Sequence, residues 1–212
     1  MSEVYEVMKK YGHIMANQNY PIGDTAKMVI ETADGVFATK AGADVAVLSE
    51  GDIEKLEIAR LPVADEEIKA VVYSQTPYCQ QCLNENKPIK AALDDMAQIV
   101  GHTAEIIDVR ESNRKREREV RKALKDNVGC MVLKSVDDSG NLLMGHTLTL
   151  GRNLYEAVVA MTVLEKSAEV SILAEKLGGD KPIPKWEAKL MRFIYKKKYS
   201  KAEEKVKTQE VN

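Results

Sequence analysis

The sequence predicts a single-domain α/β fold, because apolar patterns typical of strands alternate along the chain with patterns typical of helices. Its 212 residues are a length typical of one domain, and 44% hydrophobic residues are ordinary for a globular protein. No apolar run approaches the ~20 residues of a membrane-spanning helix, and residues 1–10 lack the apolar core of a signal peptide. We therefore expect a soluble, cytoplasmic protein with no membrane partner.

In the first half of the chain, the pattern predicts one helix followed by strands. Apolar residues recur at helical spacing over residues 3–16, which indicates an amphipathic helix. Asp34-Gly35 lies between two short β-type runs and is a common hairpin turn. Residues 49–56 open with Ser-Glu-Gly-Asp and predict a short helical turn. The strands predicted in this half are 27–30, 35–39 and, as a continuous apolar run, 70–74.

In the second half, helix and strand patterns alternate, which is typical of the α/β class. The strands predicted there are 104–109, 129–134 and 141–150, with a turn at 137–140. The helices predicted there are 89–100, 113–125, 154–176 and a last helix from residue 186. In this last helix, we expect four large apolar residues to pack on the body while the lysines face outward. These four residues are Trp186, Leu190, Phe193 and Ile194.

The charge balance argues against a nucleic-acid partner. The 31 Lys and Arg residues are offset by 33 Asp and Glu residues, which gives a net charge of −2. Such a chain has no overall electrostatic attraction for a phosphate backbone. In residues 113–125, glutamates interleave with the basic residues, which is typical of a solvated helix stabilised by i, i+4 pairs.

Three stretches in a fixed order resemble the class II aldolase/adducin family. Residues 34–56 are similar to the family's strand, Thr-Pro-Ser-Gly loop and short helix. Residues 70–78 are similar to its buried strand, which ends in a His-x-His pair before Pro-Tyr. Residues 150–170 are similar to the long helix after the last metal ligand, and the resemblance covers roughly residues 3–178.

The resemblance implies a fold, an assembly and a chemistry. The fold is an α/β/α sandwich around a mostly antiparallel central sheet, here spanning 1–180, with a C-terminal helical extension and polar tail at 181–212. The assembly is a homo-oligomer, usually a tetramer. The family's lyase chemistry is the cleavage of a phosphorylated keto-sugar by a zinc ion held by three histidines, with a Glu as acid/base.

The positions that match the zinc ligands depart from the family's pattern. Tyr73 and Gln75 stand at the His-x-His pair, and neither is an ordinary zinc ligand. Counting back from Leu150-Gly151-Arg152, His146 falls within one residue of the third histidine, whereas counting forward from Asn127 finds no histidine. We therefore expect no metal site and no cofactor, and Tyr73, Gln75 and His146 are only candidates for catalytic positions.

The family's acid/base glutamate is displaced as well. Leu61-Pro62 runs almost directly into Glu66-Glu67, so the helix that bears this glutamate in the family is predicted to be missing here.

The phosphate-binding region is altered rather than lost. By resemblance, the family's Gly-Asn pair corresponds to Ala26-Lys27, and its Thr-Pro-Ser-Gly loop to residues 39–42. Lysine is a good point-charge ligand for phosphate, and a glycine lets the backbone approach an anion. The predicted anion pocket consists of Lys27, Thr39, Lys40 and Gly42. The alternative is that both lysines are ordinary solvated residues at strand ends.

Cys79 and Cys82 form a C-x-x-C motif directly after the strand 70–74. A strand, this motif and then a helix is the context of a thiol–disulfide site, where the helix N-terminus lowers the pKa of a thiol. About seventy residues precede this strand, and the proline expected beside such thiols is absent between Pro88 and Pro182. The alternative is that the cysteines are small core residues.

The sequence thus leaves three functions open. The first is an aldolase-like protein without zinc-dependent cleavage that binds a small anionic or phosphorylated metabolite or acts as an interaction protein. The second is an active sugar-phosphate aldolase or epimerase with a rearranged site. The third is a thiol–disulfide redox protein that uses Cys79 and Cys82.

Overall fold

The computed structural model of the chain describes residues 2–18, 26–63, 65–108, 114–136 and 142–210. Its strands are β1 Lys27–Thr32, β2 Gly35–Thr39, β3 Ile53–Lys55, β4 Ala70–Ser74, β5 Ile89–Lys90, β6 Thr103–Ala104, β7 Ile106–Asp108, β8 Gly129–Val136 and β9 Leu142–Gly151. Its α-helices are α1 Ser2–Ala16, α2 Pro77–Asn84, α3 Arg114–Ala123, α4 Leu154–Lys176 and α5 Lys185–Glu210. Shorter helical turns are η2 Val45–Val47, η3 Glu50–Asp52 and η4 Met96–Val100.

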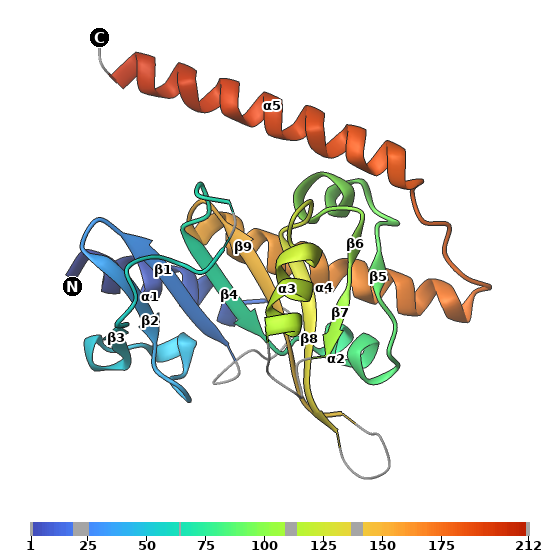
Figure 1. The fold of residues 1–212 in the computed structure, drawn as a ribbon, viewed down its shortest axis with the longest axis horizontal. Coiled ribbons are helices and arrows are strands. Elements are labelled where there is room, and N and C mark those ends of the chain that lie inside the picture. Colours follow the sequence, from blue (N-terminus) through green and yellow to red (C-terminus); the bar gives the residue numbers. More distant parts are fainter. Residues whose placement is uncertain (1, 19–25, 64, 109–113, 137–141, 211–212) are drawn as a thin grey trace.

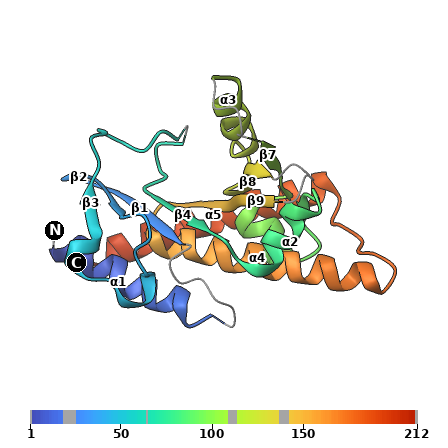
Figure 2. The ribbon, with the colours of Figure 1, turned by 90° about the horizontal axis from the view of Figure 1, so that it is seen from below.

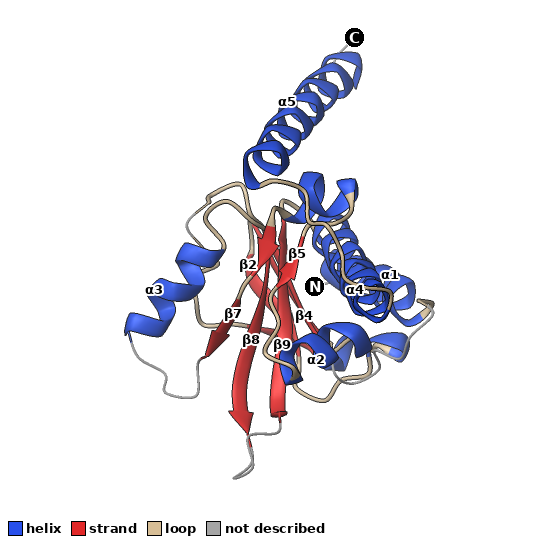
Figure 3. Ribbon diagram, turned by 90° about the vertical axis from the view of Figure 1, so that its right-hand side faces the viewer, coloured by secondary structure: helices blue, strands red, loops and turns tan. Residues whose placement is uncertain are grey.

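Seven strands form one central sheet in the order β3-β2-β1-β4-β9-β8-β7 (Figure 1). Neighbouring strands are antiparallel except β7 and β8, which are parallel. Helices α1, α2 and α4 cover one face of the sheet, while α3 lies on the other side (Figure 3). The predicted α/β fold, with helices around a mostly antiparallel sheet, is confirmed.

Alternation along the strands decides which face of the sheet each side chain occupies. Met28, Ile30 and Val72 are buried in one apolar cluster with residues of α1 and α4. Val29 and Val71, at the positions between them, belong to a different cluster on the opposite face. Burial of the first set under the helices therefore directs the second set toward the side that α3 and the segment after β3 occupy (Figure 2).

Several predicted elements are confirmed with nearly the predicted bounds. These are the helix 3–16, the hairpin of β1 and β2, the strand 70–74 and the helix 154–176. Helix α4 begins where the side chain of Asn153 accepts a hydrogen bond from the Glu156 N–H. It ends before Gly178 and Gly179, whose φ angles of +108° and +102° are accessible to glycine and terminate the helix.

The prediction of one helix over residues 89–100 is wrong. Residues 89–90 form β5, which pairs with β6, and the backbone N–H of Ala91 donates to the carbonyl of His102. Helical structure is confined to the end of the segment, where η4 is a π-helix. Pairing with β6 gives the backbone of this stretch its hydrogen bonds, so it does not need a helix to satisfy them.

Two smaller expectations need correction. Residues 104–109 are not one strand, because the chain changes partner at Glu105: Ala104 pairs with Ile89, whereas Ile106 pairs with Met131. The helical turn expected at 49–56 is the single 3₁₀ turn η3, after which Ile53 continues into β3 and pairs with Thr39. The predicted turn at 137–140 lies outside the described residues.

Helix α5 contacts the body through a different face from the one predicted. The exposed fractions of Trp186 and Phe193 are 69% and 62%, and Leu190 and Ile194 are about half exposed. The contact face has Ala188 and Arg192, which are buried. The guanidinium of Arg192 donates to the carbonyls of Gln98 and Ile99 at the C-terminal end of η4, where the carbonyls of a helix attract a cation.

None of the helices in the described ranges is both long and apolar enough to span a membrane.

A buried carboxylate joins α2 to α4. Glu165 of α4 is 1% exposed, and its two oxygens accept hydrogen bonds from the backbone N–H groups of Tyr78 and Cys79, at 2.8 and 2.9 Å. These N–H groups belong to the first turn of α2, and the N–H groups of a first turn have no carbonyl partners within their own helix. Glu165 thus caps α2 from a neighbouring helix.

We predict that Glu165→Gln lowers the free energy of unfolding by about 1–3 kcal/mol, because its amide group would place a donor against one of these N–H donors. Urea unfolding followed by circular dichroism measures the change. Glu169→Gln, on the same helix and engaged only with Lys166, is the matched control and should change stability by less than about 0.5 kcal/mol. Equal losses in the two variants would contradict the capping role.

Candidate functional site

The face of the sheet that α1 and α4 leave uncovered forms a cleft of about 1350 Å³, which we call the sheet cleft. Its floor includes Val29, Val71 and Leu148, from β1, β4 and β9. The segment after β3 forms one wall and α3 the other, on the same side of the sheet (Figure 2). Arg192 of α5 lies at the lining as well.

Strand pairing arranges the floor in rows. Lys27 lies opposite Tyr73, and Tyr73 lies opposite Leu148. Residues directly opposite one another in neighbouring strands direct their side chains to the same face of a sheet. His146 lies two residues from Leu148 on β9 and continues the same face. Gln75 follows Tyr73 by two residues, just after the end of β4, and both Gln75 and His146 line the cleft.

The sheet cleft brings together six of the seven residues predicted at the candidate catalytic and anion positions. The six are Lys27, Lys40, Gly42, Tyr73, Gln75 and His146. The seventh, Thr39, is fully buried, and its hydroxyl accepts a hydrogen bond from the Met28 N–H at 3.0 Å. Thr39 therefore stabilises the pairing of β1 and β2 from within the structure instead of lining the cleft.

Tyr73 and His146 contact each other through their rings. The ring centroids are 5.2 Å apart with the rings edge to face, and His146 is 9% exposed. Burial raises the pKa of Tyr73, and the thiol of Cys130 raises it further, so its hydroxyl stays protonated at neutral pH. The side-chain amide of Gln75 donates to the carbonyl of Gly145 at 2.8 Å.

These donors do not fit a zinc ion. Zinc sites in proteins use imidazole, thiolate or carboxylate ligands, whereas these three positions offer one imidazole, a protonated phenol and an amide already bound to the backbone. Within the described ranges, no group of three His, Cys, Asp or Glu residues lies close enough to hold a metal ion. The family's zinc chemistry therefore has no ligand set at these positions.

The anion candidates lie at the ends of β1 and β2. The ammonium of Lys27 is 3.9 Å from the carboxylate of Glu54, and both side chains are more than one-third exposed, so this ion pair is weak. Lys40 lines the cleft, and its ammonium donates to the carbonyl of Gly51 at 2.6 Å. Gly42 has a φ of +76°, a backbone conformation that favours glycine.

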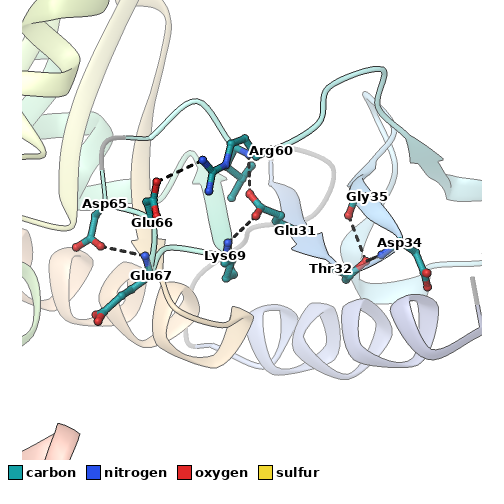
Figure 4. A network of polar contacts seen from close by, with 10 residues as sticks. Glu31, Thr32, Asp34, Gly35, Arg60, Asp65, Glu66, Glu67 and Lys69 are labelled. Carbon is teal, nitrogen blue, oxygen red and sulfur yellow. Dashed lines mark hydrogen bonds and ion pairs between the residues drawn. The ribbon is translucent and has the colours of Figure 1, made fainter.

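The wall after β3 is held by a polar network (Figure 4). Glu31 accepts hydrogen bonds from the ammonium of Lys69 at 2.5 Å and from the Leu61 N–H at 2.7 Å. Arg60 and Glu66 form a more exposed ion pair at 3.4 Å. The described residues between β3 and β4 contain no helix, which agrees with the missing helix that the sequence predicts around Glu66.

The C-x-x-C motif lies on the other side of the sheet. Cys79 and Cys82 are free thiols on α2, 0% and 3% exposed, in the cluster that α2 forms with α4. Burial raises the pKa of both thiols, that of Cys82 to about 11, and Glu165 raises the pKa of Cys79 further. A thiol–disulfide site needs an accessible thiol with a lowered pKa, so this geometry favours the interpretation as core cysteines.

Four basic residues of the cleft were not predicted from the sequence. They are Arg121 and Lys125 from the region of α3, and Arg192 and Lys196 from α5. Both helices were expected to present their charges to solvent. Val120 and Leu124, at i and i+4 in the charged segment, are the one signal that this segment lies against an apolar surface, and both line the cleft.

A known protein family matches the central part of the chain. The family described as "Class II Aldolase and Adducin N-terminal domain" matches residues 56–172, which is more than half of the chain. None of the curated proteins matches the chain at the sequence level.

Solved structures show the same fold at low sequence identity. An L-fuculose 1-phosphate aldolase is 19% identical and has a TM-score of 0.74. The aligned region covers 92% of this chain and 97% of the aldolase chain. L-fuculose-1-phosphate aldolase from Thermus thermophilus is 16% identical, with 87% and 100% coverage and a TM-score of 0.64. The corresponding enzyme from Glaciozyma antarctica is 15% identical, with 90% and 81% coverage and a TM-score of 0.62. The fold predicted from the resemblance is therefore confirmed.

We predict that Glu31→Gln lowers the free energy of unfolding by about 1 kcal/mol at pH 7, because it removes the charge that pairs with Lys69. Lys69 and the Leu61 N–H lower the pKa of the Glu31 carboxyl. Its stabilising contribution is therefore present above the usual glutamate pKa of ~4.3 and is lost as the pH falls through the lowered value.

Urea unfolding of both proteins between pH 7 and about pH 3 tests this, and the two stability curves should converge at the acidic end. Glu66→Gln, in the exposed pair with Arg60, should change stability at neither pH. A deficit in Glu31→Gln that persists unchanged in acid would contradict the ionic contribution.

We also predict slow alkylation of all three cysteines in the folded protein. A thiol pKa of about 11 leaves Cys82 with on the order of 100-fold less thiolate than an ordinary cysteine has, and a pKa of about 12 leaves Cys130 with on the order of 1000-fold less. Iodoacetamide labelling with peptide mass spectrometry, in buffer and in 6 M urea, measures this. Rapid labelling of Cys79 or Cys82 in buffer alone would instead support the redox alternative.

Proposed function

Because the chain belongs to the class II aldolase and adducin family, we propose that it is a member that does not perform zinc-dependent aldol cleavage and instead binds a small anionic or phosphorylated metabolite. The site is the polar end of the sheet cleft, where Lys27, Lys40 and Gly42 line the same hollow as Tyr73 and His146.

The single observation that supports this proposal most is the donor set at the family's ligand positions. Tyr73 and His146 touch through their rings, and Gln75 is bound to the Gly145 carbonyl. Three histidines would present three imidazole nitrogens to one point, whereas here two of the three positions present groups that zinc does not favour.

Anion binding is supported by the two lysines. Their ammonium groups lie at the ends of adjacent strands, and neither is neutralised by a buried carboxylate, since the Glu54 partner of Lys27 is itself 41% exposed. The positive φ of Gly42 turns the backbone beside Lys40 without a side chain, which leaves room for a phosphate or carboxylate.

A second candidate function is a sugar-phosphate aldolase or epimerase with a rearranged site, in which Tyr73 and His146 exchange protons with the substrate. The edge-to-face contact of their rings inside the cleft favours this candidate. Aldol cleavage also needs a group that stabilises the enediolate, and Lys27 and Lys40 are cations that line the cleft.

We further propose that the protein is a cytoplasmic homo-oligomer, a tetramer by family resemblance. The exposed Trp186, Leu190 and Phe193 on α5 support an interface, because contiguous apolar patches on a surface mark contacts with other chains. The same patch supports the alternative of an interaction protein.

We predict that the double variant Lys27→Ala/Lys40→Ala binds inorganic phosphate and ketose phosphates at least tenfold more weakly than the unchanged protein, since each ammonium contributes a charge-assisted contact. Isothermal titration calorimetry measures the affinities. Lys90→Ala, an exposed lysine on β5 outside the cleft, is the matched control and should bind normally.

Elemental analysis of protein purified without chelator separates the two candidate functions. Substoichiometric zinc together with phosphate binding supports the proposal. Stoichiometric zinc that is lost in His146→Ala, with cleavage of a ketose phosphate, would overturn it in favour of the enzyme.

A further inference from the structure

The sheet cleft is larger and more apolar than a small sugar phosphate requires. Its volume of about 1350 Å³ exceeds the ~300–1,000 Å³ typical of small-molecule sites. The polar residues of the proposed anion site occupy only one end of it. The proposed function therefore does not explain the apolar lining of the rest of the cleft.

The floor of this remaining part is aliphatic, as the strand register requires. Val29 lies opposite Val71, and Val71 lies opposite Leu150, so all three direct their side chains into the cleft in one row. This row lies two residues, about 7 Å, along the strands from the row of Lys27 and Tyr73.

The walls are aliphatic as well. Leu61 and Ile68 from the segment after β3 are buried against the floor residues, in the same apolar cluster. Leu124, from the end of the α3 segment, packs on that cluster from the opposite side. Sugar hydroxyls placed here would lose their hydrogen bonds to water without gaining partners, which opposes binding of a fully hydroxylated ligand.

Positive charge flanks the aliphatic part at both ends. Lys27 and Lys40 lie at one end, and Arg192 and Lys196 line the cleft from α5. Two carboxylates, those of Asp65 and Asp126, also line it. Asp65 accepts a hydrogen bond from the Glu67 N–H, and Asp126 is paired with Lys189 at 3.3 Å, so both are already engaged.

We propose that the ligand of the sheet cleft is a soluble amphipathic anion, with a phosphate or carboxylate head at Lys27 and Lys40 and an aliphatic chain along Val29, Val71 and Leu150. This inference rests on the proposed function, because it uses the same anion site and names the class of molecule that fills it. Removal of the chain from water supplies binding free energy, and the lysines fix its orientation.

Calorimetric titration of the full-length protein with inorganic phosphate and with butyl, hexyl and octyl phosphate, below the concentrations at which micelles form, tests this proposal. Affinity should rise about three- to fourfold for each added methylene group. Octanoate, titrated in parallel, distinguishes a carboxylate head from a phosphate head, and either head supports the proposal.

The variant Leu124→Gln should flatten the dependence on chain length while leaving the binding of inorganic phosphate unchanged. Leu173→Gln, a 45% exposed leucine on α4 outside the cleft, is the matched control and should retain the dependence. Thermal unfolding checks that both variants are folded, and a chain-length dependence that survives Leu124→Gln undiminished would place the alkyl chain elsewhere and overturn the proposal.

The two proposals fail in distinguishable ways. Binding of phosphate and ketose phosphates without any gain from the alkyl chain would overturn the amphipathic ligand and leave the proposed function intact. Absence of binding for every phosphate would overturn both.

Discussion

The pairing of β4 with β1 on one side and β9 on the other is the constraint on which the candidate site depends. It places Lys27, Tyr73 and Leu148 in one row across three strands. A slip of one residue in either pairing would turn a strand's cleft-facing side chains into the helix-covered core. The hydroxyls of Ser74 and Thr147, both buried and 2.6 Å apart, oppose such a slip, because each would lose its partner in the core.

On the face of the sheet away from the cleft, the packing of α2 against α4 determines the reactivity of the cysteines. Glu165 is the buried carboxylate of that layer, and both its oxygens are used by the first turn of α2. Its negative charge beside Cys79 contributes to the raised thiol pKa, so the helix N-terminus that would activate a cysteine elsewhere is neutralised here. The same contact that stabilises α2 therefore explains why a C-x-x-C motif at a helix start is a poor thiol site in this fold.

Local sequence was enough to predict the elements whose periodicity agrees with their final packing, such as the strand 70–74 and the helix 154–176. It was misleading where the backbone's partner lies far along the chain. Residues 89–90 pair with β6, and Arg192 binds the carbonyls that end η4, and neither contact is visible in a window of neighbouring residues. The polar end of the cleft could be predicted because the family resemblance aligned it, whereas its basic far end depends on how α3 and α5 are placed.

The altered ligand positions and the aliphatic floor favour the same kind of binding. The described residues between β3 and β4 form no helix, and the segment that Glu31 anchors there packs Leu61 as a wall in the same apolar cluster as the floor residues. A low-dielectric wall beside Lys27 and Lys40 strengthens their attraction for an anion, since charges interact more strongly where water is excluded. Zinc would need imidazole, thiolate or carboxylate ligands at this place, whereas Tyr73 offers a phenol whose pKa burial raises above its usual value. The environment that disfavours zinc is thus the one in which two lysines bind an anion with an apolar body.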